Sequence, residues 1–278
     1  MPTSDFIVAE AGLCNKLRSL LSYREVAMQC GRNLIVLWRR GPFCDARFDQ
    51  LFELLGGVTF IGDMSELEQP HREALAAAGG EAAARVYDSH PIIKYTDGEA
   101  HMYASLAPLP AIRAAVSCWV SACGGPFVAV HMRRTDHLQM FGDRTPDAAF
   151  FAFLDRHAHL PIFLATDNAE TQVDVLRRYG PRVRVLAPID PLPCPGEEDP
   201  PDTSGPERHT TVERAVTDLF ICVEAHAFMG SYLSSFSDTI ALLRRARGRD
   251  VSRDAHVVRS LGGKHYDPEV HSVELPEI

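Results

Sequence analysis

The sequence lacks the features that direct a protein into a membrane or an oxidising compartment. No run of about 18 or more apolar residues occurs among its 278 residues. The N-terminal MPTSDFIVAEAG has neither the basic start nor the apolar stretch of a signal peptide. The seven cysteines are scattered without a C-x-x-C pair, so neither a zinc site nor a disulfide framework is expected. We therefore expect a cytoplasmic protein with reduced thiols and no bound metal.

The sequence is also short of positive charge and of two phosphate-binding fingerprints. The formal net charge is -9, whereas a surface for nucleic acid or an anionic membrane needs a basic face, so we expect neither partner. The Walker pattern G-x-x-x-x-G-K-[ST] and the dinucleotide pattern G-x-G-x-x-G are both absent. A phosphoryl-transfer enzyme is therefore only a weak alternative, and any phosphate site must be local.

Strand and helix patterns alternate along the whole chain. In the first half, strand patterns occupy 6–9, 33–38 and 58–62, and helix patterns occupy 15–29, 46–55, 67–85 and 111–123. In the second half, strand patterns occupy 127–130, 162–165, 183–186 and 227–233, and helix patterns occupy 147–158, 169–180 and a segment beginning near Asp238. Such alternation predicts parallel sheets built from β-α-β units.

Glycines and prolines divide this pattern. Gly124-Gly125-Pro126 separates the two halves, so we expect an N-terminal domain over 1–124 and a C-terminal domain over 125–278. Segment 188–209 contains seven prolines; a mobile surface loop is favoured there over an acceptor-binding lid. The next helix begins near Thr210 or Thr211, and Thr210 as N-cap would place Glu213 in a capping box. The fold class predicted is α/β, with two Rossmann-like domains facing a cleft.

Charged residues follow the strand pattern FVAV, in the sequence HMRRTD. Ligands of open parallel sheets bind at the carboxyl ends of strands, where the guanidinium fork of an arginine suits a phosphate. Side chains alternate along a strand, so Arg133 and Arg134 should differ in function. We assign a phosphate to Arg133 and a structural ion pair, with Asp136 or another acid, to Arg134. Solvated charges or interdomain salt bridges are the plain alternative.

Three further loops fall at predicted strand ends. Asp167 in ATDN could accept hydrogen bonds from a nucleotide or sugar hydroxyl, or simply cap the following helix. The serines of GSYLSSFSD precede a helix, whose N-terminal N-H groups attract anions, although serines there are also ordinary caps. Glu10 and Asn15 in EAGLCN lie where the first β-α turn would direct them into the cleft.

Taken together, these motifs resemble the fucosyltransferase superfamily. The collinear segments are G-L-x-N-x-L-R near the N-terminus, V-H-M-R-R-T-D, F-L-A-T-D-N, and R-H-T-T-x-E-R-A-x-x-D-L leading into F-M-G-S-x-x-S-S-F-S. The superfamily includes α-1,6-fucosyltransferases of N-glycan cores and nodulation factors, and protein O-fucosyltransferases. The resemblance implies a GT-B-like fold and an inverting transfer from GDP-fucose to a glycan or protein hydroxyl. It implies neither a cofactor nor a divalent metal.

The resemblance also assigns functions to individual residues. Arg133 matches the arginine on the donor diphosphate, and His131 the histidine near the guanine. Asp167 matches an acid after the second strand of the donor domain, and Asp218 an acid in the helix before the serine loop. The phosphate-side serine loop itself corresponds to Ser234, Ser235 and Phe236. Asp190 is a further candidate for contact with the guanine, although its position is offset from that of the family.

One departure from the family concerns the general base. The core α-1,6 enzymes have a glutamate after R-R-T-D, where this sequence has Phe141, with Asp143 two residues later. Some protein O-fucosyltransferases have the base in the N-terminal glycine loop instead, which corresponds to Glu10. We expect Glu10 to be the base, with Asp143 and then Asp136 as alternatives. Another nucleotide-sugar donor, or a non-catalytic nucleotide-sugar or glycan-binding protein, are the competing hypotheses.

Overall fold

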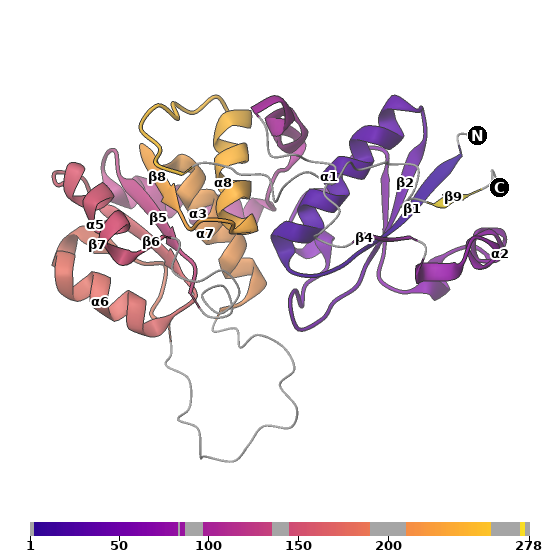
Figure 1. The fold of residues 1–278 in the computed structure, drawn as a ribbon, viewed down its shortest axis with the longest axis horizontal. Coiled ribbons are helices and arrows are strands. Elements are labelled where there is room, and N and C mark those ends of the chain that lie inside the picture. The colour runs from indigo at the N-terminus through magenta and orange to yellow at the C-terminus, as the bar shows by residue number, and fades with distance from the viewer. Residues whose placement is uncertain are drawn as a thin grey trace, which may run out of the picture. The chain divides into compact units, whose positions relative to one another are not determined.

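The computed structural model forms two compact units (Figure 1), one made of Met1–Leu109 with Ser260–Ile278 and the other of Pro110–Arg259. The structure describes residues 3–82, 84–86, 97–134, 145–189, 210–256 and 273–275. Within these ranges, no helix has both the length and the apolar content needed to cross a membrane.

The first unit is built on a five-stranded sheet with the order β3-β2-β1-β4, to which β9 adds on β1. Its strands are β1 (Ser4–Ala9), β2 (Asn33–Trp38), β3 (Val58–Ile61), β4 (Arg85–Val86) and β9 (Val273–Leu275). Its helices are α1 (Leu13–Gln29) and α2 (Gln69–Ala77), with 3-10 turns at Phe48–Gln50, Met64–Glu66, Gly80–Ala82 and Asp97–Ser105. All pairs are parallel except β1 with β9. The predicted β-α-β unit is therefore confirmed.

One predicted helix of this unit is wrong. Segment 46–55 has buried side chains at helical spacing, yet only Phe48–Gln50 form a 3-10 turn. The backbone around Phe52 pairs instead with a later segment: Glu53 N donates to Ala107 O at 2.9 Å, and Leu109 N donates to Leu51 O at 3.0 Å. These tertiary hydrogen bonds use groups that a continuing helix would need.

The second unit is built on a four-stranded parallel sheet with the order β7-β6-β5-β8. Its strands are β5 (Val128–Met132), β6 (Ile162–Thr166), β7 (Val183–Arg184) and β8 (Ala227–Gly230). Its helices are α3 (Pro110–Cys123), α5 (Asp147–Arg156), α6 (Ala169–Tyr179), α7 (Val212–Glu224) and α8 (Ser235–Ala246), with a 3-10 turn at Gly180–Arg182. The strand and helix alternation predicted for this half is thus confirmed.

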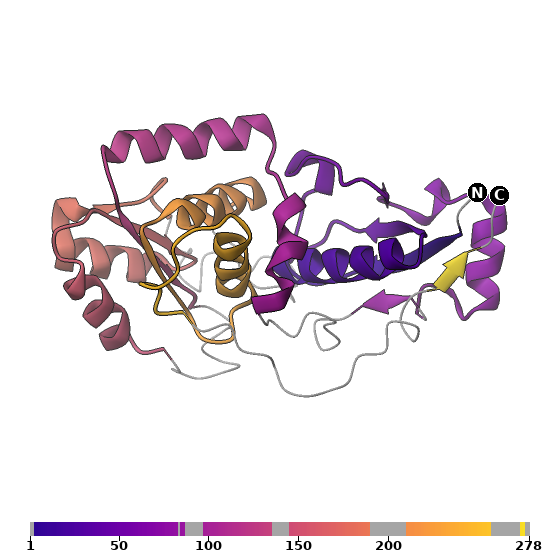
Figure 2. The ribbon, with the colours of Figure 1, turned by 90° about the horizontal axis from the view of Figure 1, so that it is seen from above.

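Helices cover both faces of this second sheet (Figure 2). On one face, Val128 and Val130 pack with Phe150 of α5 and Val175 of α6. On the other face, α7 packs against β5 and β6, and Trp119 of α3 meets the ring of Phe163 at 4.7 Å between centroids. Since side chains alternate along a strand, His131 points to the α7 side, away from the apolar cluster that contains Val130.

The division between the units differs from the expected boundary at 124–125. Helix α3 belongs to the second unit because it packs against α7. The chain also returns to the first unit at its end, where Ser4 to Phe6 pair with Leu275 to Val273. The contacts thus divide the chain differently from the expected domains over 1–124 and 125–278. The glycines mark the end of α3, whereas packing determines which unit that helix joins.

Candidate functional site

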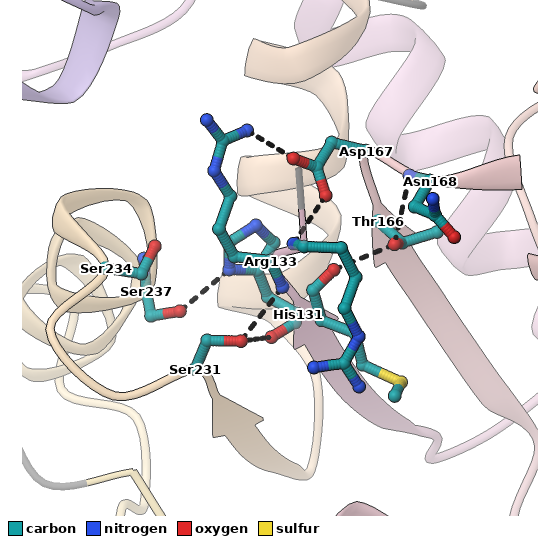
Figure 3. A network of polar contacts seen from close by, with 10 residues as sticks. His131, Arg133, Thr166, Asp167, Asn168, Ser231, Ser234 and Ser237 are labelled. Carbon is teal, nitrogen blue, oxygen red and sulfur yellow. Dashed lines mark hydrogen bonds and ion pairs between the residues drawn. The ribbon is translucent and has the colours of Figure 1, made fainter. Parts of the chain in front are cut away.

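The carboxyl ends of β5, β6 and β8 bring several polar residues together (Figure 3). Strands β6 and β8 flank β5 in parallel register, so the residues that follow all three strands lie at one edge of the sheet. These residues are Arg133 after β5, Asp167 after β6 and Ser231 after β8. The sequence predicted Arg133 and Asp167 as site residues, and the structure places them in direct contact.

Arg133 is held by its side chain and by its backbone. Its Nη1 donates to Asp167 Oδ2 at 2.6 Å, and the two side chains are 28% and 20% exposed. Its backbone N-H donates to Ser231 Oγ at 2.9 Å, while that hydroxyl donates to His131 O at 3.2 Å. The guanidinium is therefore oriented by the protein and still accessible to solvent.

Arg134 has a different environment, as the alternation of side chains predicted. Its side chain forms an ion pair with Asp147 of α5 and lies over the ring of Phe150 at 5.8 Å. Its backbone N-H donates to Asp167 Oδ1 at 2.8 Å. Asp167 thus binds Arg133 with one oxygen and the backbone of Arg134 with the other, so each of its carboxylate oxygens has a protein partner.

The serine loop forms the N-terminus of α8. Ser234 is the N-cap, whose Oγ accepts from Ser237 N at 3.4 Å, so the helix begins at Ser235 instead of near Asp238. Leu233, just before the cap, has a φ of 55°, a conformation that non-glycine residues rarely adopt. This turn directs the first N-H groups of α8 to the same sheet edge as Arg133, which is the geometry of an anion site.

His131 lies beneath this helix end. The side chain is buried, at 5% exposure; its Nδ1 is 2.7 Å from Ser237 Oγ, and its ring lies 4.6 Å from the ring of Phe236. Histidine and the first turn of α8 therefore form one packed unit. The contacts of His131 seen here orient the serine loop.

Gly230 allows α8 to approach β8 closely. A Cβ at this position would lie 2.5 Å from both Cβ and Oγ of Ser237. We expect Gly230→Ala to destabilise the protein by about 1–3 kcal/mol through overpacking, and to weaken ligand binding at this edge. Urea unfolding measures the first effect. Gly125→Ala is the matched control because a Cβ there meets nothing within 4 Å; equal losses in both variants would contradict the prediction.

Asp218 is a buried carboxyl group in the middle of α7. Burial raises its pKa to about 7, and the positive charge of Arg214, one helical turn earlier, opposes that rise. Arg214 itself donates to the carbonyls of Ala187 at 2.6 Å and Pro188 at 3.1 Å. The helix N-cap is Thr211, which accepts from Arg214 N, and not Thr210. Arg214, the last residue of the motif R-H-T-T-x-E-R, therefore anchors the segment that precedes residue 190.

The raised pKa of Asp218 predicts a pH-dependent stability. The ordinary pKa of about 3.9 lies below the folded value, so the folded state binds the proton more tightly and stability falls as pH rises from about 4 to 7. Asp218→Asn should therefore stabilise the protein at pH 8, by on the order of a few kcal/mol, and much less at pH 4.5. Urea unfolding at both pH values measures this; a difference independent of pH would contradict it.

The remaining predicted residues lie elsewhere. Glu10 follows β1 in the first unit, and Asn15 lies in the first turn of α1, where its Oδ1 accepts from Arg18 Nη2 at 3.0 Å. The predictions for Asp136, Asp143, Asp190 and the neighbouring Phe141 fall outside the residues that the structure describes.

Two serines that organise the site are not singled out by the sequence pattern. Ser231 links the ends of β5 and β8, and Ser237 links α8 to His131. Both occur in the segment GSYLSSFSD, but their partners are about 100 residues away in the chain, and no local pattern reveals them. The sequence likewise predicts an acidic partner for Arg134 but does not identify it as Asp147.

Solved structures share this fold. NodZ α-1,6-fucosyltransferase soaked with GDP-fucose is similar with a TM-score of 0.56 and 16% identity, over 86% of this chain and 92% of that one. NodZ from Bradyrhizobium has a TM-score of 0.52 and 18% identity, over 88% and 93%. POFUT1 in complex with GDP-fucose has a TM-score of 0.51 and 14% identity, over 90% and 97%. No protein-family model and no curated protein sequence matches the chain.

At these identities the similarity establishes the fold. It confirms the predicted α/β, GT-B-like architecture with two Rossmann-like units, and it agrees with the resemblance that four collinear motifs indicated. The chain is therefore similar in fold to two fucosyltransferases, NodZ and POFUT1.

Proposed function

We propose that the protein is an inverting, metal-independent glycosyltransferase that moves fucose from GDP-fucose to a hydroxyl of a glycan or protein. The main support is the convergence of the Arg133 guanidinium and the N-terminus of α8 at one sheet edge. Two proteins of similar fold have been crystallised with GDP-fucose. An arginine fork and a helix N-terminus are the groups that a diphosphate requires.

The same groups suit the transition state of sugar transfer. Breaking the bond between the anomeric carbon and GDP develops negative charge on the β-phosphate, which Arg133 and the first N-H groups of α8 would stabilise. A guanidinium has five donors, so one arginine can bind both the carboxylate of Asp167 and a phosphate. Asp167 would then orient Arg133, Ser234 and Ser235 would face the phosphates, and Phe236 with His131 would support the loop. Contacts of Asp190 and Asp218 with the nucleotide are part of the same proposal.

Inverting transfer also needs a base for the acceptor hydroxyl. We propose Glu10, at the carboxyl end of β1, with Asp143 and Asp136 as alternatives. Glu10→Gln should lower the rate of transfer by about 10²–10⁴-fold while leaving GDP affinity within about twofold. Transfer assays and calorimetry on one preparation measure both quantities. Glu25→Gln on α1 is the control. An unchanged rate of transfer in Glu10→Gln would show that another residue is the base.

Isothermal titration with GDP, GDP-fucose, GDP-mannose, UDP-glucose and ADP in the presence of EDTA tests the donor. Binding restricted to guanine nucleotides would support the proposal. Binding of another nucleotide class would show that the donor is not GDP-fucose. Among the residues that the structure describes, no three His, Cys, Asp or Glu side chains are placed to hold a metal ion; the EDTA arm tests metal independence directly. Binding of GDP-fucose without release of GDP in an acceptor screen would favour a non-catalytic binding protein.

A further inference from the structure

A short segment after α8 contacts both ends of that helix. In this segment, Asp254–His256, the Asp254 carboxylate accepts from Arg244 Nε at 2.8 Å in the last turn of α8. The segment is also tied to β8, because Phe228 N donates to Asp254 Oδ1 at 2.9 Å and Ala255 N donates to Phe228 O at 2.9 Å. The C-terminal end of α8 and the neighbouring strand are thus held by Asp254 and Ala255.

The other end of α8 is held by His256. Its Nε2 lies 2.8 Å from Oδ1 of Asp238, and the two side chains are only 2% and 4% exposed. With Asp238 ionised, its carboxylate can only accept, so Nε2 is then the donor. A charge-assisted hydrogen bond in such a buried setting is stronger than the same contact at the surface.

Three consecutive residues of the first turn of α8 are therefore fixed from different directions. Phe236 and Ser237 contact His131, and Asp238 contacts His256. Successive residues of an α-helix are about 100° apart around its axis, so these contacts together restrain the rotation of the helix end.

We propose that His256 is a positioning residue: through Asp238 it sets the orientation of the first turn of α8, and with it the N-H groups and serine hydroxyls at the sheet edge. The inference rests on the proposed function, in which these groups bind the diphosphate of a nucleotide sugar. Binding groups need to be held within about 0.5 Å and 10–20° of their productive geometry. The buried contact of Asp238, three residues after Ser235, meets this need.

A matched pair of variants tests the proposal by calorimetry with GDP. In His256→Gln the amide nitrogen reaches about as far as Nε2 and can donate to Asp238, whereas in the shorter His256→Asn it cannot. We expect His256→Asn to weaken GDP binding about tenfold and His256→Gln to stay within about threefold of the parent. Val175→Ala, buried on the opposite face of the sheet, lowers stability without touching α8 and should bind GDP normally.

Amide hydrogen exchange without any ligand separates the two proposals. Exchange at Ser237 and Asp238 should be faster in His256→Asn than in the parent or Val175→Ala, because the first turn opens locally. If the parent binds no GDP, the proposed function fails while exchange still tests the contact. Unchanged exchange and affinity in His256→Asn, or equal losses in all three variants, would overturn the inference. Should His256→Asn not fold, Asp238→Asn weakens the same contact and is expected to act in the same direction.

Discussion

Replacement of Arg133 by alanine is expected to lower the affinity for GDP by about 100-fold, the equivalent of a lost charge-assisted contact of about 3 kcal/mol. The guanidinium is preorganised by Asp167 at 2.6 Å, so the parent protein gains the phosphate contact without first ordering a long side chain. In the variant, the carboxylate of Asp167 would also lose its guanidinium partner and repel the diphosphate. Calorimetry with GDP measures the change.

Two further variants make the Arg133 test specific. Arg177→Ala removes an exposed arginine that forms an ion pair with Asp174 on the surface of α6, and surface ion pairs contribute little. The GDP affinity of this variant should match the parent. Arg133→Lys keeps the charge but loses the planar fork, so an intermediate affinity is expected. Normal GDP binding by Arg133→Ala would remove the central support for the donor site.

Replacement of Arg244 by methionine should have the largest effect on stability, about 3–5 kcal/mol. Its side chain has no exposed surface. It pairs with Asp254 at 2.8 Å and donates through Nη1 to backbone carbonyls at the end of α7, which are those of Cys222, Val223 and Ala225. Removal of the guanidinium takes a donor from each of these carbonyls and the cationic partner from the buried Asp254 carboxylate, which still accepts from Phe228 N; loss of the charged partner of a buried carboxylate costs far more than a surface contact.

Urea or thermal unfolding measures the Arg244 effect, with an expected fall in Tm of roughly 10 °C. Arg177→Met is the matched control, because it makes the same chemical change in an ion pair whose side chains are 73% and 62% exposed. The control should change stability by less than about 0.5 kcal/mol. A loss of similar size in both variants would show that the Arg244 network contributes no more than a surface pair.

Much of the fold could be predicted because local patterns and packing agree. The strand at 33–38 was predicted with its observed bounds, and α1 ends before Gly31, whose φ of 68° suits glycine. These elements have both the right periodicity and a clear end signal. The segment at 46–55 shows the opposite case: its periodicity is helical, but Leu51 and Glu53 hydrogen bond to residues near 108, which a local pattern cannot show.

The candidate site also has features that the sequence predicts and features that only the structure shows. The sequence by itself determined the residue types available at each strand end. It indicated Arg133 and Asp167 because charged residues directly follow apolar strands, and it indicated Ser234 through the resemblance to a family motif. Only the tertiary structure decided their partners: Asp167 contacts both arginine positions, and Ser237 reaches His131 across 106 residues of sequence. Hydrogen bonds act over about 3 Å in space, whereas sequence patterns report on neighbours in the chain, so residues such as Ser231 and His256 become visible only in the folded protein.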